Sequence, residues 1–317
     1  MEQQSEKTAS RKKYFLAAFF APLIWGFMAI SVRWVKEYPA EDILYYRILV
    51  ALIVLWLFIL IFRFKSLKRD IIVFKQLSRR QRNQTIGLTV LASVLIFGNW
   101  FAYIYTVNHI SVQSAAFAYL ICPLITAIAA FFILKEQLSP LKRMALGIAL
   151  ISAVTLASGS FIDVLWSMSI ASLYALYLIV QRASQGFDKL NMLAVQLTLC
   201  SLFVVPKLFI NQHSFPTAPF FWFSILTIAV VFTIIPLFFS MYALTRISSS
   251  TTGVLLYINP LIAFTLAITY FQETVAAYKY LAYSFILFAI ILFNWETLKK
   301  IIKRKRGHIP NESFKYH

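Results

Sequence analysis

Two apolar stretches share a layout that decides the fold: FAYLICPLITAIAAFFILKEQL (117–138) and VLLYINPLIAFTLAITYFQETV (254–275). Each carries a proline within an otherwise helical run, Pro123 in LICPLI and Pro260 in YINPLI, and each has a glutamate 13 residues after that proline. A proline inside a helix removes a backbone donor and costs a soluble helix about 3 kcal/mol or more. Two such prolines at matching positions indicate that one unit occurs twice.

The composition indicates a membrane protein. Of the 317 residues, 60% are hydrophobic and 13% are charged, which is too apolar for an ordinary soluble domain. Apolar runs of about 18 to 22 residues follow one another along the chain, and each can span a bilayer core of roughly 30 Å. The sequence therefore predicts an all-α polytopic membrane protein with ten transmembrane helices. Their expected bounds are 14–34, 43–62, 85–107, 113–134, 141–158, 160–180, 190–210, 220–243, 251–271 and 278–296.

The positive charge is distributed unevenly along the chain. A net charge of +18 could indicate a nucleic-acid partner. If the N-terminus is cytoplasmic, however, most Lys and Arg fall in cytoplasmic segments, and the outer loops hold only Arg33, Lys36, Lys207 and Lys279. This is the positive-inside pattern. We therefore expect a multi-pass protein of a bacterial cytoplasmic membrane, with both termini cytoplasmic and with anionic lipids rather than nucleic acid as partners.

The two halves of the chain align with each other. An offset of 137 residues pairs Glu136 with Glu273, and an offset of 149 earlier in each half pairs Arg47 with Gln196. Five spans is an odd number, so the second half must cross the membrane in the opposite sense, as in the inverted repeats of secondary transporters. We expect a first five-helix repeat at 1–158, a second at 159–297 and a basic cytoplasmic tail at 298–317.

An insertion at 63–84 accounts for the difference between the two offsets. Its sequence, RFKSLKRDIIVFKQLSRRQRNQ, interrupts a field of Lys and Arg with Ile71, Ile72, Phe74 and Leu77. This pattern predicts an amphipathic helix that lies on the cytoplasmic leaflet. A solvated loop is the alternative.

The paired prolines predict a helix kink and an unpaired backbone carbonyl in each half. Pro123 leaves the carbonyl of Tyr119 without its helical donor, and Pro260 does the same to Leu256, so each carbonyl needs another partner in hydrocarbon. We expect Pro123 and Pro260 to shape a cavity wall or a gating hinge, although proline is also common in transmembrane helices in general. Further breaks are expected at Pro22 and Pro236.

Arg47 is the charged residue expected within a span. A charge at bilayer depth costs about 3 kcal/mol on insertion scales, so its side chain should face a cavity or a partner. An arginine in a cavity would favour a carboxylate or another anionic group on the substrate. The alternative is that Arg47 reaches the outer headgroups beside Glu41 or Asp42.

Other polar residues of the spans are candidates for substrate binding. Asn99 and Tyr103 are four residues apart and share a helix face, although a helix–helix hydrogen bond would also explain Asn99. The remaining candidates are Trp25, Tyr119, Gln196, Thr233, Tyr257 and Asn259.

Several chemistries find no support in the sequence. No His, Asp or Glu is expected near a membrane midplane, no metal-ligand spacing or nucleotide-binding loop is present, and Cys122 and Cys200 cannot be assumed to pair. We therefore expect no cofactor and no enzyme activity. A membrane-embedded lipid-modifying enzyme and a non-transporting sensor or scaffold remain the alternatives to transport.

Several motifs resemble those of a known family. LIWG (23–26), YYR (45–47), NWFAYIYTVN (99–108), TIIPLFFSMYALTRISSSTTGVLLYINPL (233–261) and FQETV (271–275) are similar to RarD proteins of the EamA branch of the drug/metabolite transporter superfamily. The resemblance covers nearly the whole chain and departs from the family at Cys122, where a more polar residue is usual. It implies a permease or exporter that moves a small organic metabolite or drug through a central cavity by alternating access. It leaves the substrate, the coupling ion and the choice between monomer and homodimer open.

Overall fold

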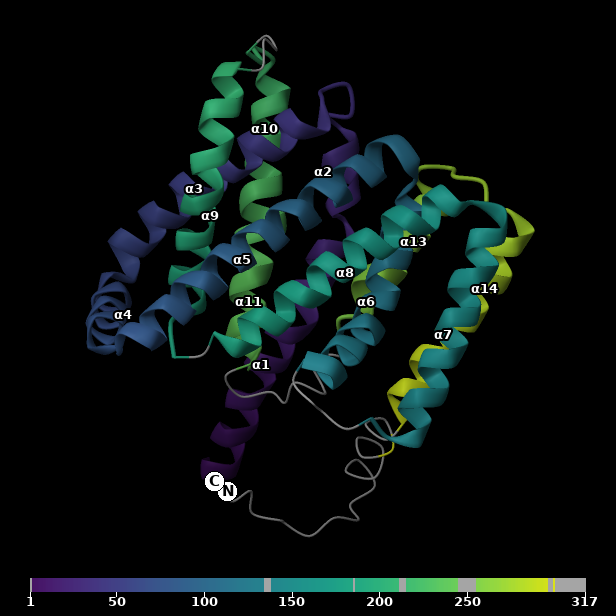
Figure 1. Ribbon diagram of the computed structural model, residues 1–317, viewed down its shortest axis with the longest axis horizontal. Helices are drawn as coiled ribbons and strands as arrows, with labels where there is room; N and C mark the ends of the chain where they lie inside the picture. Colours follow the sequence, from purple (N-terminus) through teal and green to yellow (C-terminus); the bar gives the residue numbers. More distant parts are fainter. Residues whose placement is uncertain are drawn as a thin grey trace.

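The computed structural model describes residues 2–133, 138–184, 186–210, 215–244, 255–295 and 299. Every regular element within those ranges is a helix (Figure 1). The predicted all-α class is therefore confirmed for this part of the chain. Glu136 and nearly all of the expected basic tail at 298–317 lie outside the described residues.

The first half consists mostly of long helices that are joined by short connections. Their bounds are α1 Glu2–Gly26, α2 Met28–Arg33, α3 Ala40–Phe62, α4 Phe64–Gln76, α5 Arg79–Tyr105, η1 Thr106–Ile110, α6 Val112–Ile133 and α7 Pro140–Gly159. Those of the second half are α8 Phe161–Ala183, α9 Lys189–Ile210, α10 Pro219–Ala229, η2 Val230–Ile234, α11 Ile235–Leu244, α13 Ile258–Thr269 and α14 Ala277–Phe293. The two η elements are single π-helical turns.

Local sequence explains where several helices begin. Ser78 and Gln81 form a reciprocal capping box at the start of α5, which satisfies two backbone donors that a helix end leaves open. Pro140 and Pro219 occupy the first turns of α7 and α10, where a missing N–H is harmless. The Ser160 side chain accepts from the backbone N–H of Asp163 at the start of α8.

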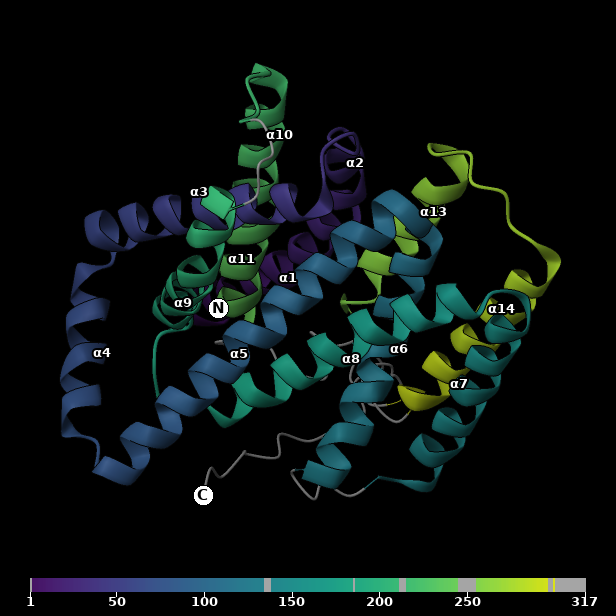
Figure 2. The same ribbon diagram turned by 45° about the horizontal axis from the view of Figure 1, so that its top comes forward.

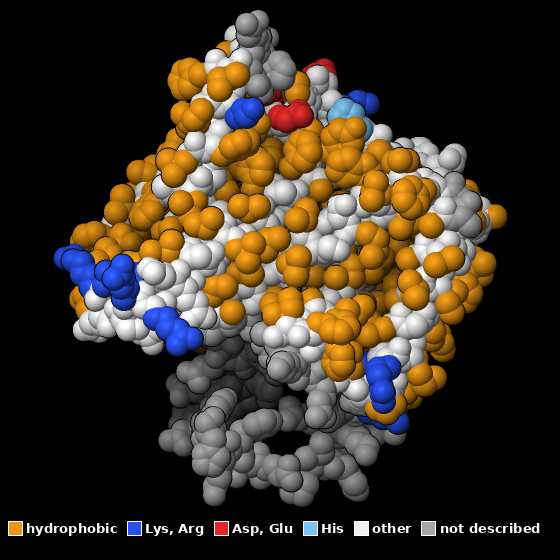
Figure 3. All heavy atoms as spheres, viewed as in Figure 1, with side chains coloured by type: hydrophobic (Ala, Val, Ile, Leu, Met, Phe, Trp, Pro, Cys, Tyr) orange, Lys and Arg blue, Asp and Glu red, His pale blue; other side chains and the backbone are white. Residues whose placement is uncertain are grey.

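Eight helices of the described chain are long and apolar enough to cross a membrane. Two further apolar helices, α13 and α14, are shorter, with 12 and 17 residues. Hydrophobic side chains cover most of the face seen in Figure 3, with Lys and Arg at its margins. The protein is therefore a multi-pass membrane protein, while ten crossings remain a proposal.

Helices of the first half pack mainly against helices of the second half. Helix α1 contacts α11 and α13, and α3 contacts α9 and α10. In turn, α8 packs against α5 and α6, α9 packs against α5, and α7 packs against α14 (Figures 1 and 2). Because the main packing joins one half to the other, the halves are not separate lobes.

Two expected spans are interrupted, and only the second interruption lies at a break that the sequence predicts. The first breaks at Phe27, between α1 and α2. The eighth contains the π-turn η2, immediately before Pro236. The break expected at Pro236 is thus present, while Pro22 lies inside α1 without ending it.

The two repeat prolines occupy different positions in their helices. Pro123 lies inside α6, as predicted. For Pro260 the prediction of an interior proline is wrong: α13 begins at Ile258, so Pro260 lies in its first turn. The Leu256 carbonyl accepts from the backbone N–H of Asn259, 3.3 Å away, so Pro260 does not leave it unpaired. A proline is tolerated in a first turn because the N–H there has no helical acceptor.

The insertion at 63–84 is helical. It contains α4 and the capped first residues of α5, and α4 bridges the end of α3 and the start of α5 (Figure 2). Ile71 and Ile72 are exposed beside the exposed cations Lys68 and Arg69. The insertion thus contains a helix that exposes apolar and basic side chains together, while its place on the cytoplasmic leaflet remains a proposal.

Candidate functional site

Arg47 is the most deeply buried charged residue of the described chain, with 2% of its surface exposed. Its Nε and Nη2 atoms donate to Thr233 Oγ1 at 3.2 and 2.9 Å, and its guanidinium carbon lies 4.1 Å from the ring centroid of Trp100. The Nη1 atom has no hydrogen-bond partner. Arg47 therefore does not extend to the headgroups beside Glu41 or Asp42, and the alternative of an outward-reaching side chain is wrong for this structure.

The π-turn η2 explains why Thr233 is available to Arg47. A proline at position 236 removes the donor that would bind the carbonyl of residue 232 in an α-helix. The Phe232 carbonyl instead accepts from Trp25 Nε1 at 3.0 Å, and the N–H of Ile235 reaches back to Val230. Such π-turns in α-helices often lie at functional sites. One local irregularity thus brings α1, α3 and the α10–α11 segment to one point.

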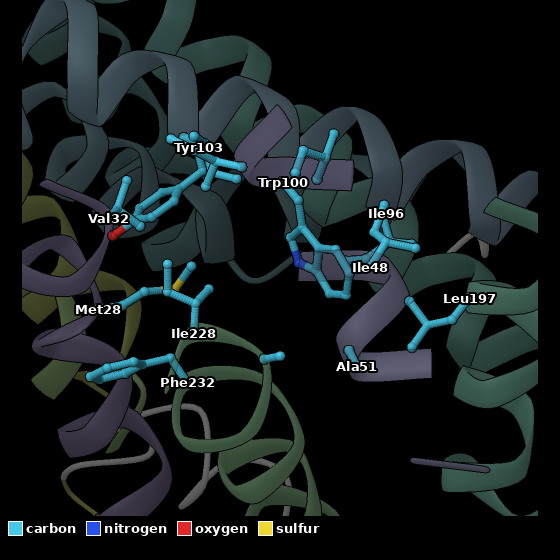
Figure 4. Close-up of a cluster of buried hydrophobic side chains, with 14 of the residues drawn as sticks. Met28, Val32, Ile48, Ala51, Ile96, Trp100, Tyr103, Leu197, Ile228 and Phe232 are labelled. Atoms are coloured by element: carbon cyan, nitrogen blue, oxygen red, sulfur yellow. The ribbon is translucent and has the colours of Figure 1, made fainter. Parts of the chain in front are cut away.

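The face of α5 opposite this turn is aromatic. Trp100 and Tyr103, three residues apart and both buried, project from α5 into the buried cluster: Tyr103 extends toward Val32, whereas Trp100 lies on the side of Ile48 (Figure 4). Aromatic rings in this position give Arg47 a cation–π partner in place of water. The central polar group is therefore enclosed by apolar side chains of both halves.

Asn99 lies beside Trp100 on α5 and is 1% exposed. Its Nδ2 donates to the Ile170 carbonyl of α8 at 2.9 Å, while its Oδ1 has no partner. The helix–helix hydrogen bond considered for Asn99 is therefore present. The buried Oδ1 atom of Asn99 nevertheless remains available to accept a hydrogen bond.

A row of tyrosines leads from the site into the second half. Ring centroids are 5.8 Å apart for Tyr103 and Tyr119, 5.9 Å for Tyr119 and Tyr174, and 6.0 Å for Tyr174 and Tyr177. At the far end, the Tyr177 hydroxyl donates to Gln196 Oε1 at 3.2 Å. The row connects Gln196, which the sequence alignment of the two halves pairs with Arg47, to the surroundings of Arg47.

The structure separates two candidates from the others. Tyr257 belongs to a different buried cluster, together with Phe117 and Tyr283. Asn259 is half-buried on α13. The structure brings together Trp25, Arg47, Thr233, Tyr103 and Tyr119, with Asn99 beside them and Gln196 at the end of the tyrosine row.

Several contributors were not among the sequence candidates. Trp100 directly follows Asn99 and shares a face with Tyr103, so helical spacing could have identified it. Tyr174 and Tyr177 lie in LYALYLIVQR, which aligns with the first span and could have pointed to them. The Phe232 carbonyl could have been found only by asking which acceptor Pro236 leaves open.

A polar cluster joins three segments at one end of the molecule. Glu273 accepts from the backbone N–H groups of Val112 and Gln113 at 2.8 and 3.1 Å, and its carboxylate pairs with Arg33 at 2.9 Å. A carboxylate at a helix N-terminus satisfies open donors and complements the helix dipole. Gln272, before it, has a left-handed backbone with φ 53°, which is costly for a residue with a side chain. We call Arg33, Glu273 and the start of α6 the α6-end cluster.

A second polar cluster lies where α3 meets α4. Asp70 on α4 accepts from Asn191 Nδ2 and the Asp188 backbone N–H at 2.8 and 2.9 Å. Asp188 in turn accepts from the first backbone N–H groups of α9 and pairs with Arg63. We call this group the α4–α9 cluster. It ties the insertion of the first half to the second half.

The central arrangement can bind an acceptor group but offers no obvious catalyst. Within the described ranges, no three His, Cys, Asp or Glu side chains gather as metal ligands would. The groups at the centre are a guanidinium, a hydroxyl, an amide and aromatic rings. Such a set suits recognition of a polar group among largely apolar side chains.

Comparison with known families matches two consecutive regions. The model of the EamA-like transporter family matches residues 12–158 and again residues 162–295. Together these matches cover most of the chain.

Curated relatives extend along nearly the whole chain. An uncharacterized transporter, YojE of Bacillus subtilis, is 28% identical over 92% of this chain and 96% of its own length. Protein RarD of Streptomyces exfoliatus is 28% identical over 93% and 91%. Protein RarD of Escherichia coli is 27% identical over 88% and 91%. The resemblance to RarD proteins is thereby confirmed.

One solved structure shares the fold. It superposes with a TM-score of 0.61 at 16% sequence identity and covers 89% of this chain and 97% of that chain. At this identity the likeness concerns the fold alone.

Proposed function

The chain belongs to the EamA-like transporter family, and from that premise we propose that it moves a small organic molecule across the bacterial cytoplasmic membrane by alternating access. It is a membrane transporter of the drug/metabolite type, and two of its curated relatives are likewise named as transporters. The observation that carries the finer proposal is the buried Arg47. A charge kept within the spans, with one nitrogen unpaired, is a mark of a substrate path.

The pattern of helix contacts supports an inverted repeat. If α1, α3, α5, α6 and α7 exchange with α8, α9, the α10–α11 segment, α13 and α14, each major contact maps either onto another contact or, as for α7 with α14, onto itself. The contact of α1 with α11 becomes that of α8 with α5, and α3 with α10 becomes α9 with α5. A site near the axis of such a repeat is typical of secondary transporters.

The same contacts favour two groups of helices that move against each other, and each group contains helices from both halves. One group contains α1, the α10–α11 segment and α13; the other contains α8, α5 and α6. Arg47, on α3, lies between them: it donates to Thr233 of the first group and stacks on Trp100 of the second. Rocking of one group against the other would open the site without breaking the packing inside either group.

The two end clusters are placed to act as gates. In the α6-end cluster, Glu273 follows α13 of one group and caps α6 of the other. The α4–α9 cluster fastens the opposite end of α3 to α9. In alternating access, one end must loosen while the other stays closed, and hydrogen-bonded clusters can exist in two such discrete arrangements.

We place the α4 end on the cytoplasmic side. The exposed cations Lys65, Lys68, Arg69 and Lys75 all lie on α4, and Figure 3 shows Lys and Arg gathered at this corner. Anionic lipids of the cytoplasmic leaflet would attract such a helix. Mapping the N-terminus to the outer side would contradict this orientation.

Flux measurements test the transport proposal. Purified protein in proteoliposomes should give saturable counterflow for a subset of labelled aromatic acids, their amides and amphipathic drugs. The folded Arg47→Gln variant should lose most of this flux, whereas Lys36→Gln, which removes an exposed charge, should not. A protein that binds one of these compounds but never moves it would contradict transport, and unchanged flux in Arg47→Gln would remove Arg47 from the site.

A further inference from the structure

We infer that the central site binds an organic monocarboxylate, with its carboxylate end-on to Arg47 and its apolar body against the aromatic rings of α5, α6 and α8. This inference rests on the proposed function, because it identifies the class of substrate that the transport site would take.

The hydrogen bonds of Arg47 leave one edge of its guanidinium open. A guanidinium has five N–H donors in a fixed plane. Thr233 Oγ1 takes the Nε donor and one Nη2 donor, so one donor remains on Nη2 and two remain on the unpartnered Nη1. The Nη1 donor and the Nη2 donor that face each other form the end-on fork of the group. Two parallel N–H groups match the two oxygens of a carboxylate.

The charge of the site matches a single negative charge. Arg47 is the only fully buried Lys or Arg in the part of the chain that the structure describes, and none of its contacts there is with a carboxylate. A buried cation without a counter-ion is costly. A monoanion would neutralise it, whereas a phosphate dianion would leave an excess charge in a low-dielectric surrounding.

The surroundings of the guanidinium favour a carboxylate whose remaining part is apolar and flat. The indole of Trp100 covers one face of Arg47, and Tyr103 shares its helix face with Trp100 (Figure 4). From there the tyrosine row continues through Tyr119 of α6 to Tyr174 of α8. Aromatic rings pack well against other flat rings in stacked or edge-on contact.

Equilibrium binding to the purified protein tests this inference without requiring transport. The probes are benzoate, phenylacetate and 3-phenylpropionate, each compared with its primary amide, which keeps the body and removes the charge. Binding is followed by thermal stabilisation and by tryptophan fluorescence. At least one acid should bind about tenfold more tightly than its amide. In Arg47→Gln the ratio should fall to about one, whereas Lys36→Gln should retain it.

The outcomes separate the inference from the proposed function. Acid binding that depends on Arg47 supports the inference even if no flux is found, and the absence of flux then counts against transport alone. Equal binding of acid and amide, no binding of any of the three acids, or an acid preference that survives in Arg47→Gln would each overturn the inference. If neutral compounds are transported at the same time, the proposed function stands without it.

Discussion

Arg47 and Trp100 form a cation–π pair at the centre of the helix bundle, with 4.1 Å between the guanidinium carbon and the ring centroid. The two residues come from α3 and α5, and each belongs to a predominantly apolar helix that is long enough to cross a membrane. Because the remaining contact of the guanidinium is with the Thr233 hydroxyl, its charge is stabilised only by neutral groups. Function rather than stability best explains an arginine at this position.

Replacing Arg47 by Met should therefore leave the fold intact and abolish binding of acids. A buried charge costs several kcal/mol of desolvation, and replacing buried charges by apolar residues is often neutral or stabilising. Thr233 would keep its hydrogen bond to the Ile228 carbonyl, so no new unpaired donor arises. We expect the melting temperature of the detergent-solubilised variant to equal or exceed that of the wild type. A fall of more than about 5 °C would show that Arg47 is structural.

The Pro236→Ala substitution tests the origin of the π-turn. Alanine restores the N–H that an α-helix would direct to the Phe232 carbonyl, which now accepts from Trp25. We expect a protein of similar or higher thermal stability in which Thr233 no longer meets Arg47, so that acid binding weakens at least about tenfold. The Trp25→Phe variant, which removes only the indole donor, should have a smaller effect. Wild-type acid binding in Pro236→Ala would show that the turn does not depend on this proline.

Gly26 and Gly147 form a matched pair for testing the contact of α1 with α13. A Cβ atom on Gly26 would lie 2.7 Å from Ile262 Cβ, whereas one on Gly147 would meet no atom within 4 Å. Gly26→Ala should destabilise the protein by about 1–3 kcal/mol through overpacking. Gly147→Ala should be neutral or stabilising by up to about 1 kcal/mol. Equal melting temperatures for the two variants would contradict the close approach of these helices.

The ion pair of the α6-end cluster can be measured by a double-mutant cycle. Arg33 and Glu273 are 23% and 15% exposed, so solvent screens their attraction only in part. The single variants Arg33→Met and Glu273→Gln and their combination should give a coupling energy of about 1 kcal/mol in denaturation measurements. Additive effects would mean that Glu273 acts only as a cap for α6.

The extent of each apolar run predicted most of the helices, because length and hydropathy alone decide whether a segment can cross a bilayer. The break at Phe27 and the short α13 escaped prediction, since packing between helices sets them: α1 must pass close to α13 at Gly26. The sequence predicts a helix interior for Pro260 because the apolar run starts before it. The helix itself starts only at Ile258.

For the site, the sequence could identify polar residues but not their partners. Arg47 stood out because a charge is rare in a span. Its contacts with Thr233 and Trp100 depend on packing between segments far apart in the chain, which no local pattern reports. The same holds for Glu273, whose position at a helix end was predictable but whose bonds to Arg33 and the start of α6 were not.

The most direct test of the account is the accessibility of residue 233 from the two sides of the membrane. In a Cys122→Ala, Cys200→Ala background, Thr233→Cys would carry the only thiol. It should react with a membrane-impermeant thiol reagent in both right-side-out and inside-out vesicles, because alternating access opens the site to each side in turn. Reaction from one side alone, or from neither, would contradict a central site that opens alternately to both sides.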